Sequence, residues 1–65
     1  MIKNVRIRER KNNEVIGEFP ITIETEHPTD DDFYQYAWDN AVSQSIADEN
    51  RRSDYDFEII EDSAN

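Results

Sequence analysis

The chain has 65 residues with no cysteine, one histidine and a formal charge of −9, from sixteen acidic and seven basic side chains. This length predicts one small domain, and the composition excludes disulfides and cysteine-based zinc sites, so aromatic and aliphatic residues must form the core. A negative field repels nucleic acid and anionic membranes, which argues against both as direct partners, and it attracts basic proteins. No apolar run approaches the ~20 residues of a membrane span and no signal-peptide pattern opens the chain, so a cytoplasmic location is expected.

The basic residues are concentrated at the start of the chain. Residues 1–11 carry five basic side chains and one acidic side chain. Residues 12–65 carry fifteen acidic side chains and only two basic ones, Arg51 and Arg52. The first element is therefore basic, and the rest of the chain is acidic.

Alternating residues predict two strands in the first part of the chain. In residues 3–9, Val5 and Ile7 belong to one face and the arginines to the other, and in residues 15–23 the odd positions are apolar apart from Gly17. A period of two is typical of strands with one buried face. Pro20 cannot donate a hydrogen bond to a neighbouring strand, so the second strand is predicted to be an edge strand or a bulged one.

The turn between these strands is predicted at "KNN", residues 11–13, because Asn tolerates positive φ. The apolar positions are odd-numbered on both strands, and directly opposed residues must share a face. The number of residues in the loop must then be odd, which predicts a three-residue loop with an Asn in the left-handed conformation.

A helix is predicted from Thr29, as its N-cap, to about Asn50, with Asp32 completing a variant of the capping box. At 100° per residue, one broad and mainly apolar arc is expected to pack on the sheet: Phe33, Tyr34, Ala37, Trp38, Ala41, Val42, Ser45 and Ile46. The opposite side holds Asp32, Tyr36, Asp39, Asn40 and Ser43. Arg51 and Arg52 come next, where cations suit the C-terminal end of a helix.

The stretch "DYDFEIIED", residues 54–62, alternates again, with Tyr55, Phe57 and Ile59 on one face, and residues 62–65 are expected to fray. The helix is the only layer available to cover the sheet. We therefore expect one α+β domain, residues 1–65. Its three-stranded antiparallel sheet has spatial order 2-1-3, with one helix packed on one face.

The three successive aspartates, Asp30, Asp31 and Asp32, are interpreted as a helix start, because carboxylates in the first turn face unpaired N–H groups and the positive end of the helix dipole. The pattern of a calcium-binding EF-hand is absent, and no metal or other cofactor is expected. Catalysis is not favoured either. The only glycine, Gly17, cannot make a phosphate-binding loop, and nothing places His27 beside a serine nucleophile.

The uncovered face of the sheet is expected to carry Arg6, Arg8 and Arg10 on its central strand. Six carboxylates would flank them: Glu14, Glu18 and Glu24 on one side, and Asp54, Asp56 and Glu58 on the other. One interpretation is a ladder of cross-strand ion pairs on a surface that keeps the chain soluble. The other is that three arginines neutralise only part of the set, so that rows of surplus anions, joined by Glu26, Asp32, Asp39 and Asp62, imitate a nucleic-acid backbone. Tyr36, on the polar helix face, is either an ordinary exposed aromatic or an anchor for a partner.

The layout "NVRIRERKNNEVIGEFPITIETEHPTDDDFYQYAWDNAV…DYDFEIIED" resembles small phage-encoded proteins that disable bacterial machinery. It is similar in length and element order to the small phage inhibitor of bacterial RNA polymerase, and in acidity to anti-CRISPR proteins and other DNA mimics. The resemblance implies a non-catalytic inhibitor that binds the basic nucleic-acid channel of a bacterial defence nuclease, CRISPR complex or polymerase.

Two sets of contact residues are predicted for such an inhibitor. The first is Glu14, Glu18, Asp54, Asp56 and Glu58, and the second is Asp32, Tyr36 and Asp39. The alternative is a small accessory or regulatory subunit that pairs an exposed strand with the sheet of a partner protein.

Overall fold

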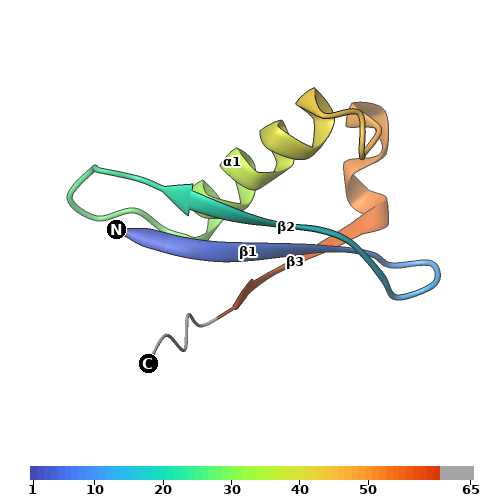
Figure 1. The fold of residues 1–65 in the computed structure, drawn as a ribbon, viewed down its shortest axis with the longest axis horizontal. Coiled ribbons are helices and arrows are strands. Elements are labelled where there is room, and N and C mark those ends of the chain that lie inside the picture. The colour runs from blue at the N-terminus through green and yellow to red at the C-terminus, as the bar shows by residue number, and fades with distance from the viewer. Residues whose placement is uncertain (61–65) are drawn as a thin grey trace.

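The computed structural model describes residues 1–60, which form β1 (Ile2–Glu9), β2 (Glu14–Thr22), α1 (Asp30–Ser43), the 3-10 helix η1 (Glu49–Asp54) and β3 (Tyr55–Ile60). The strands are antiparallel in the order β2-β1-β3, and α1 lies across one face of the sheet (Figure 1). The predicted α+β fold with spatial order 2-1-3 is confirmed. The expected frayed tail, residues 62–65, lies outside the described residues.

The core lies between α1 and the sheet. Val5 and Ile7 of β1 and Phe33 of α1 have no exposed surface. Ala37 and Ala41, also fully buried, lack large side chains and so allow the helix backbone to approach the strands. Burial of a large apolar side chain stabilises a fold by roughly 1.5–3 kcal/mol, so these few residues carry much of the stability of so small a chain.

The start of α1 is the predicted capping box. The Thr29 hydroxyl accepts from Asp32 N–H at 3.2 Å, and Thr29 N–H donates to the Asp32 carboxylate at 2.9 Å. Asp30, Asp31 and Asp32 occupy the first turn. The interpretation of the three aspartates as a helix start is confirmed.

The predicted end of the helix, near Asn50, is wrong, because α1 ends at Ser43. Ser45 has a φ of 61°, its N–H donates to Val42 C=O at 3.0 Å, and Ile46 N–H donates to Ala41 C=O at 2.9 Å. These two bonds define a Schellman motif, in which serine stands at the left-handed position usually taken by glycine. Ser45 and Ile46 therefore do not belong to the helical apolar arc, and both are exposed.

Arg51 and Arg52 correspondingly do not come directly after the end of α1, whose last turn has no basic residue. They lie in η1, which is kinked at Arg51. The prediction that they complement the dipole of α1 is wrong.

The β1–β2 hairpin contains a bulge that the alternation did not reveal. From Ile2↔Thr22 to Ile7↔Gly17 the opposed residues obey the predicted parity, but beyond the bulge Arg8 faces Val15. Val15 is consequently 42% exposed, while Ile16 packs against the core. The bulge also changes the loop. Asn13 has the predicted positive φ, 60°, but four residues separate the last opposed pair, Glu9↔Glu14, so the predicted three-residue loop is wrong.

The two edges of the sheet differ in their free backbone groups. Ile23 N–H donates to Met1 C=O at 3.0 Å, and hydrogen-bonded pairs alternate along an antiparallel ladder. The nitrogen of Pro20 therefore faces away from β1, which explains why proline is tolerated there and confirms β2 as an edge strand. On the other side, Arg10 N–H donates to Asp54 C=O at 2.9 Å, so Phe57 and Ile59 direct their N–H groups outward from β3.

Candidate functional site

The open face of the sheet carries an ion-pair ladder centred on β1. Arg6 donates to Glu18 of β2 at 3.0 Å and lies 3.8 Å from Glu58 of β3, and Arg8 donates to the same Glu58 at 2.9 Å. Arg10, which directly follows β1, has the same alternation as Arg6 and Arg8 and pairs with Asp56 of β3. All three arginines therefore lie on this face, as predicted.

Arg10 makes the shortest pair of the ladder, with Asp56 at 2.6 Å. The hydrogen bonds of the Arg10 side chain, and secondarily its charge, lower the pKa of the Asp56 carboxyl. The same hydrogen bonds, and secondarily the Asp56 charge, raise the pKa of Arg10. The carboxylates of this face are therefore already bound by groups of the chain itself.

The prediction of six carboxylates on this face, and hence of more acids than the three arginines can neutralise, is wrong. Glu14 lies opposite Glu9 in the strand pairing. Glu9 shares the face of β1 that carries Val5 and Ile7, so Glu14 lies on the helix side of the sheet. Glu24 lies beyond the end of β2, and Asp54 precedes β3 and pairs with Arg51 at 2.9 Å. The remaining acids of this face, Glu18, Asp56 and Glu58, match the three arginines.

The uncompensated carboxylates lie elsewhere. Among residues 1–60, the acids without an ion pair are on α1, in the segments that flank it, and at the hairpin: Glu9, Glu14, Glu24, Glu26, Asp31, Asp32, Asp39, Asp48 and Glu49. Lys3 reaches one helix carboxylate, Asp30, at 3.6 Å. Asp62, also expected to be uncompensated, lies outside the described residues.

The second predicted set, Asp32, Tyr36 and Asp39, is brought together on the solvent side of α1. Residues four and three positions apart lie on one helical face, all three are exposed, and Tyr36 is 53% exposed. Asp32 is engaged in the capping box, and Asp39 accepts a hydrogen bond from the Gln35 amide at 3.0 Å. The helix face thus presents an exposed tyrosine among carboxylates with no cation of its own.

An aromatic cluster occupies the side of α1 that packs on β3. Tyr34 and Phe57 have ring centroids 5.6 Å apart, and Trp38 lies 5.3 Å from Tyr55. Arg52 covers the cluster, 4.7 Å from the Phe57 ring. Burial, and secondarily the charges of nearby acids, raise the pKa of Tyr34.

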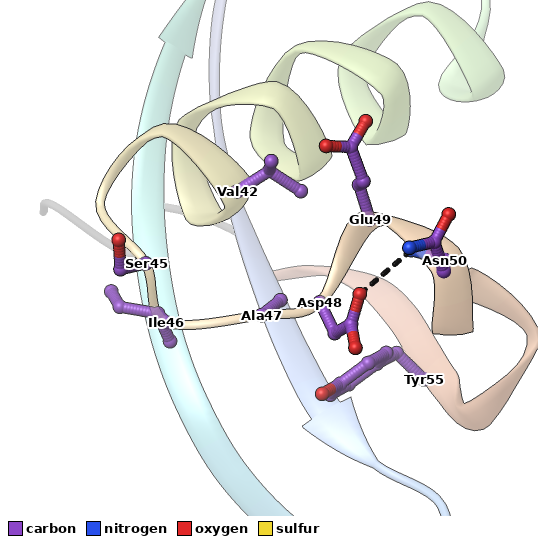
Figure 2. A pocket seen from close by; sticks show the side chains of 8 residues that line it. All are labelled: Val42, Ser45, Ile46, Ala47, Asp48, Glu49, Asn50 and Tyr55. Atoms are coloured by element: carbon purple, nitrogen blue, oxygen red, sulfur yellow. Dashed lines mark hydrogen bonds between the residues drawn. The ribbon is translucent and has the colours of Figure 1, made fainter.

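A pocket of about 480 Å³ lies at the C-terminal end of α1, where the chain turns toward η1 (Figure 2). It is lined by Val42, Ser45, Ile46, Ala47, Asp48, Glu49, Asn50 and Tyr55. Asp48 caps η1 by accepting Asn50 N–H at 2.9 Å. The sequence prediction missed this pocket because it continued the helix through these residues. Asp48, a good N-cap residue within the supposed helix, was the available signal.

Two structural observations bear on other kinds of site. No three acidic or histidine side chains come together as a potential metal site within residues 1–60. Over the same part of the chain, every helix is too short or too polar to cross a membrane.

Comparison of the chain with protein-family models, with curated proteins and with solved structures finds no match. Its function is therefore inferred from the arrangement of its own residues.

Proposed function

We propose that the chain is a non-catalytic inhibitor that binds a basic, nucleic-acid-binding surface of a bacterial protein and competes there with the nucleic acid. The partner class is a defence nuclease, a CRISPR complex or a polymerase, and the proposal assigns the chain to the bacterial cytoplasm. The supporting observation is the separation of charge between the two sides of the molecule. Within residues 1–60, the open sheet face is balanced, whereas the helix side carries several carboxylates that form no ion pair with a cation of the chain.

The contact surface proposed here is the solvent face of α1 with the segments that flank it. No lysine or arginine occurs between residues 12 and 50, so the partner must supply the cations that balance this surface. Opposite potentials of this kind steer association and raise its rate at low salt. Tyr36 supplies an amphipathic anchor at the centre of the surface, the role in which tyrosine is enriched at interface hot spots.

Two charge-matched variants test which face binds. Asp31→Asn with Asp39→Asn removes two negative charges from the helix face and leaves the Asp32 capping box intact. Glu18→Gln with Glu58→Gln removes the same charge from the open sheet face. Each variant competes with a fluorescein-labelled DNA duplex for a purified target of the proposed class, and displacement is measured by anisotropy at several salt concentrations.

Exposed ion pairs contribute about 0.2–1 kcal/mol each, so the helix-face double variant should bind about two- to thirtyfold more weakly. The open-face variant should compete within about twofold of the parent chain. Equal losses in both variants would mean that only net charge matters, and a loss confined to the open-face variant would reject the helix-side surface.

A second candidate function, as an accessory subunit that pairs with a partner's sheet, is favoured by the free edge of β3. Its outward Phe57 and Ile59 N–H groups are available, whereas Pro20 interrupts the corresponding row on β2. Ile59→Pro would remove an outward donor without removing a bond to β1. Ile59→Ala is the control for the lost side chain. Edge pairing requires that only the proline variant loses the partner, and retention of binding by Ile59→Pro would reject it.

A further inference from the structure

We propose that the pocket at the C-terminal end of α1 receives a single basic side chain, a lysine or an arginine, from the partner protein. This inference rests on the proposed function, which requires a basic partner, and adds a defined position at which one of its cations is held.

The pocket combines an apolar wall with a negatively charged rim. Val42, Ile46 and Ala47 supply aliphatic surface, and Ile46 is 39% exposed although it belongs to the pocket lining. Asp48 and Glu49 supply carboxylates, while Ser45 and Tyr55 supply hydroxyl groups. A lysine or arginine side chain has the same two parts, an aliphatic stem and a charged head, and commonly packs the stem on apolar surface.

The cations of the chain that lie nearest in sequence are engaged elsewhere. Arg51 donates to Asp54 at 2.9 Å, and Arg52 lies over the Phe57 and Trp38 rings. The end of α1 also carries the negative pole of the helix dipole, and its last turn has no basic residue. A positive group entering the pocket would therefore be attracted by the dipole and by both carboxylates.

The ligand set of the pocket favours a side chain over a metal ion. The pocket is open to solvent, and its volume of about 480 Å³ leaves room for an organic group. Only two carboxylates line it, and no cluster of three potential metal ligands occurs within residues 1–60.

Small cations can test the pocket without any target protein. The full chain, labelled with ¹⁵N, is titrated with pentylammonium as a mimic of lysine, with butylguanidinium as a mimic of arginine, and with methylammonium, which lacks the stem. Saturable shifts of the backbone amides at residues 42, 45–50 and 55 are expected for the first two probes, and the better of the two identifies the preferred head group. Methylammonium should bind measurably more weakly. Pentanol and calcium ions are the remaining controls.

Three variants assign the roles of the lining residues. Asp48→Asn keeps a side chain that can cap η1. Asp48→Asn and Glu49→Gln should each weaken pentylammonium binding by about 1.4- to fivefold, which is the range for the loss of one exposed charge pair. Glu18→Gln, which changes the net charge equally but lies on the open sheet face and outside the pocket lining, should leave binding unchanged. Ile46→Ser should weaken pentylammonium but not methylammonium.

Shifts spread over all acidic segments, an equal effect of Glu18→Gln, or the same saturable pattern with calcium ions would overturn the assignment. If the chain still competes with DNA but does not bind pentylammonium, the pocket assignment is rejected and the proposed function is retained. Loss of competition with intact pentylammonium binding would instead reject the proposed inhibitor.

Discussion

Replacement of Ser45 by glycine should stabilise the protein, because Ser45 holds the left-handed conformation that ends α1, with a φ of 61°. A side chain in this conformation costs roughly 1–2 kcal/mol relative to glycine, which has no Cβ to clash with the backbone. Glycine also gains conformational freedom in the unfolded chain, which returns about 0.4–1 kcal/mol. The net expectation for Ser45→Gly is a stabilisation of about 0.5–1 kcal/mol. For a domain of this size, that corresponds to a rise of about 2–8 °C in Tm.

The same substitution two residues earlier provides the control. Ser43 is the last residue of α1 and has a negative φ, so Ser43→Gly should be neutral or destabilising by a few tenths of a kcal/mol. Urea denaturation monitored by far-ultraviolet circular dichroism measures both variants against the parent chain. If the helix continued to Asn50, Ser45 would be an interior position and glycine there would cost about 0.5–1 kcal/mol. A lower urea midpoint for Ser45→Gly would therefore refute the Schellman motif.

Three further substitutions test packing and charge. A Cβ added at Gly17 would lie 2.9 Å from the Phe19 ring, so Gly17→Ala should destabilise the fold by about 1–3 kcal/mol in urea denaturation, and an unchanged midpoint would mean that the ring moves freely. The Arg10 hydrogen bonds lower the pKa of Asp56, so their contribution is present above the unfolded pKa and is lost as the pH falls through the folded pKa. Asp56→Asn should therefore flatten the loss of stability between about pH 5 and pH 2, measured by urea midpoints. Burial raises the pKa of Tyr34, so stability is complete below about pH 10 and is lost as the pH rises through the folded pKa, and Tyr34→Phe should reduce that alkaline loss.

The strand order could be predicted because a short hairpin joins β1 to β2 and Pro20 requires β2 to be at an edge. The odd-numbered apolar residues indicate only which residues of β1 and β2 share a face. The bulge could not be predicted, because Val15 and Ile16 are both apolar and alternation cannot decide which of them faces the core. Because the bulge was missed, Glu14 was predicted on the open face of the sheet, whereas it lies on the helix side.

The end of the helix was mispredicted for a different reason. Helix C-termini are most easily recognised by glycine, and here serine takes the left-handed position, held by two backbone hydrogen bonds. The consequence for the site was large, because the pocket exists only where α1 stops and η1 begins. The common position of Asp32, Tyr36 and Asp39 on the solvent side of α1 was predicted correctly, because it depends only on where α1 starts.

The distribution of charge indicates which carboxylates a partner would affect most. On the sheet, Arg6 lies between Glu18 of β2 and Glu58 of β3 and offsets their repulsion, and Arg8 pairs with the same Glu58. At the start of α1, the helix dipole favours the aspartates. Asp48 and Glu49 follow the opposite end of α1, whose dipole disfavours negative charge. Asp48 is stabilised in part as the N-cap of η1, but within residues 1–60 neither carboxylate forms an ion pair. A basic partner bound there relieves a repulsion that the free protein retains, so binding should raise the stability of the chain more than it does in a Glu49→Gln variant.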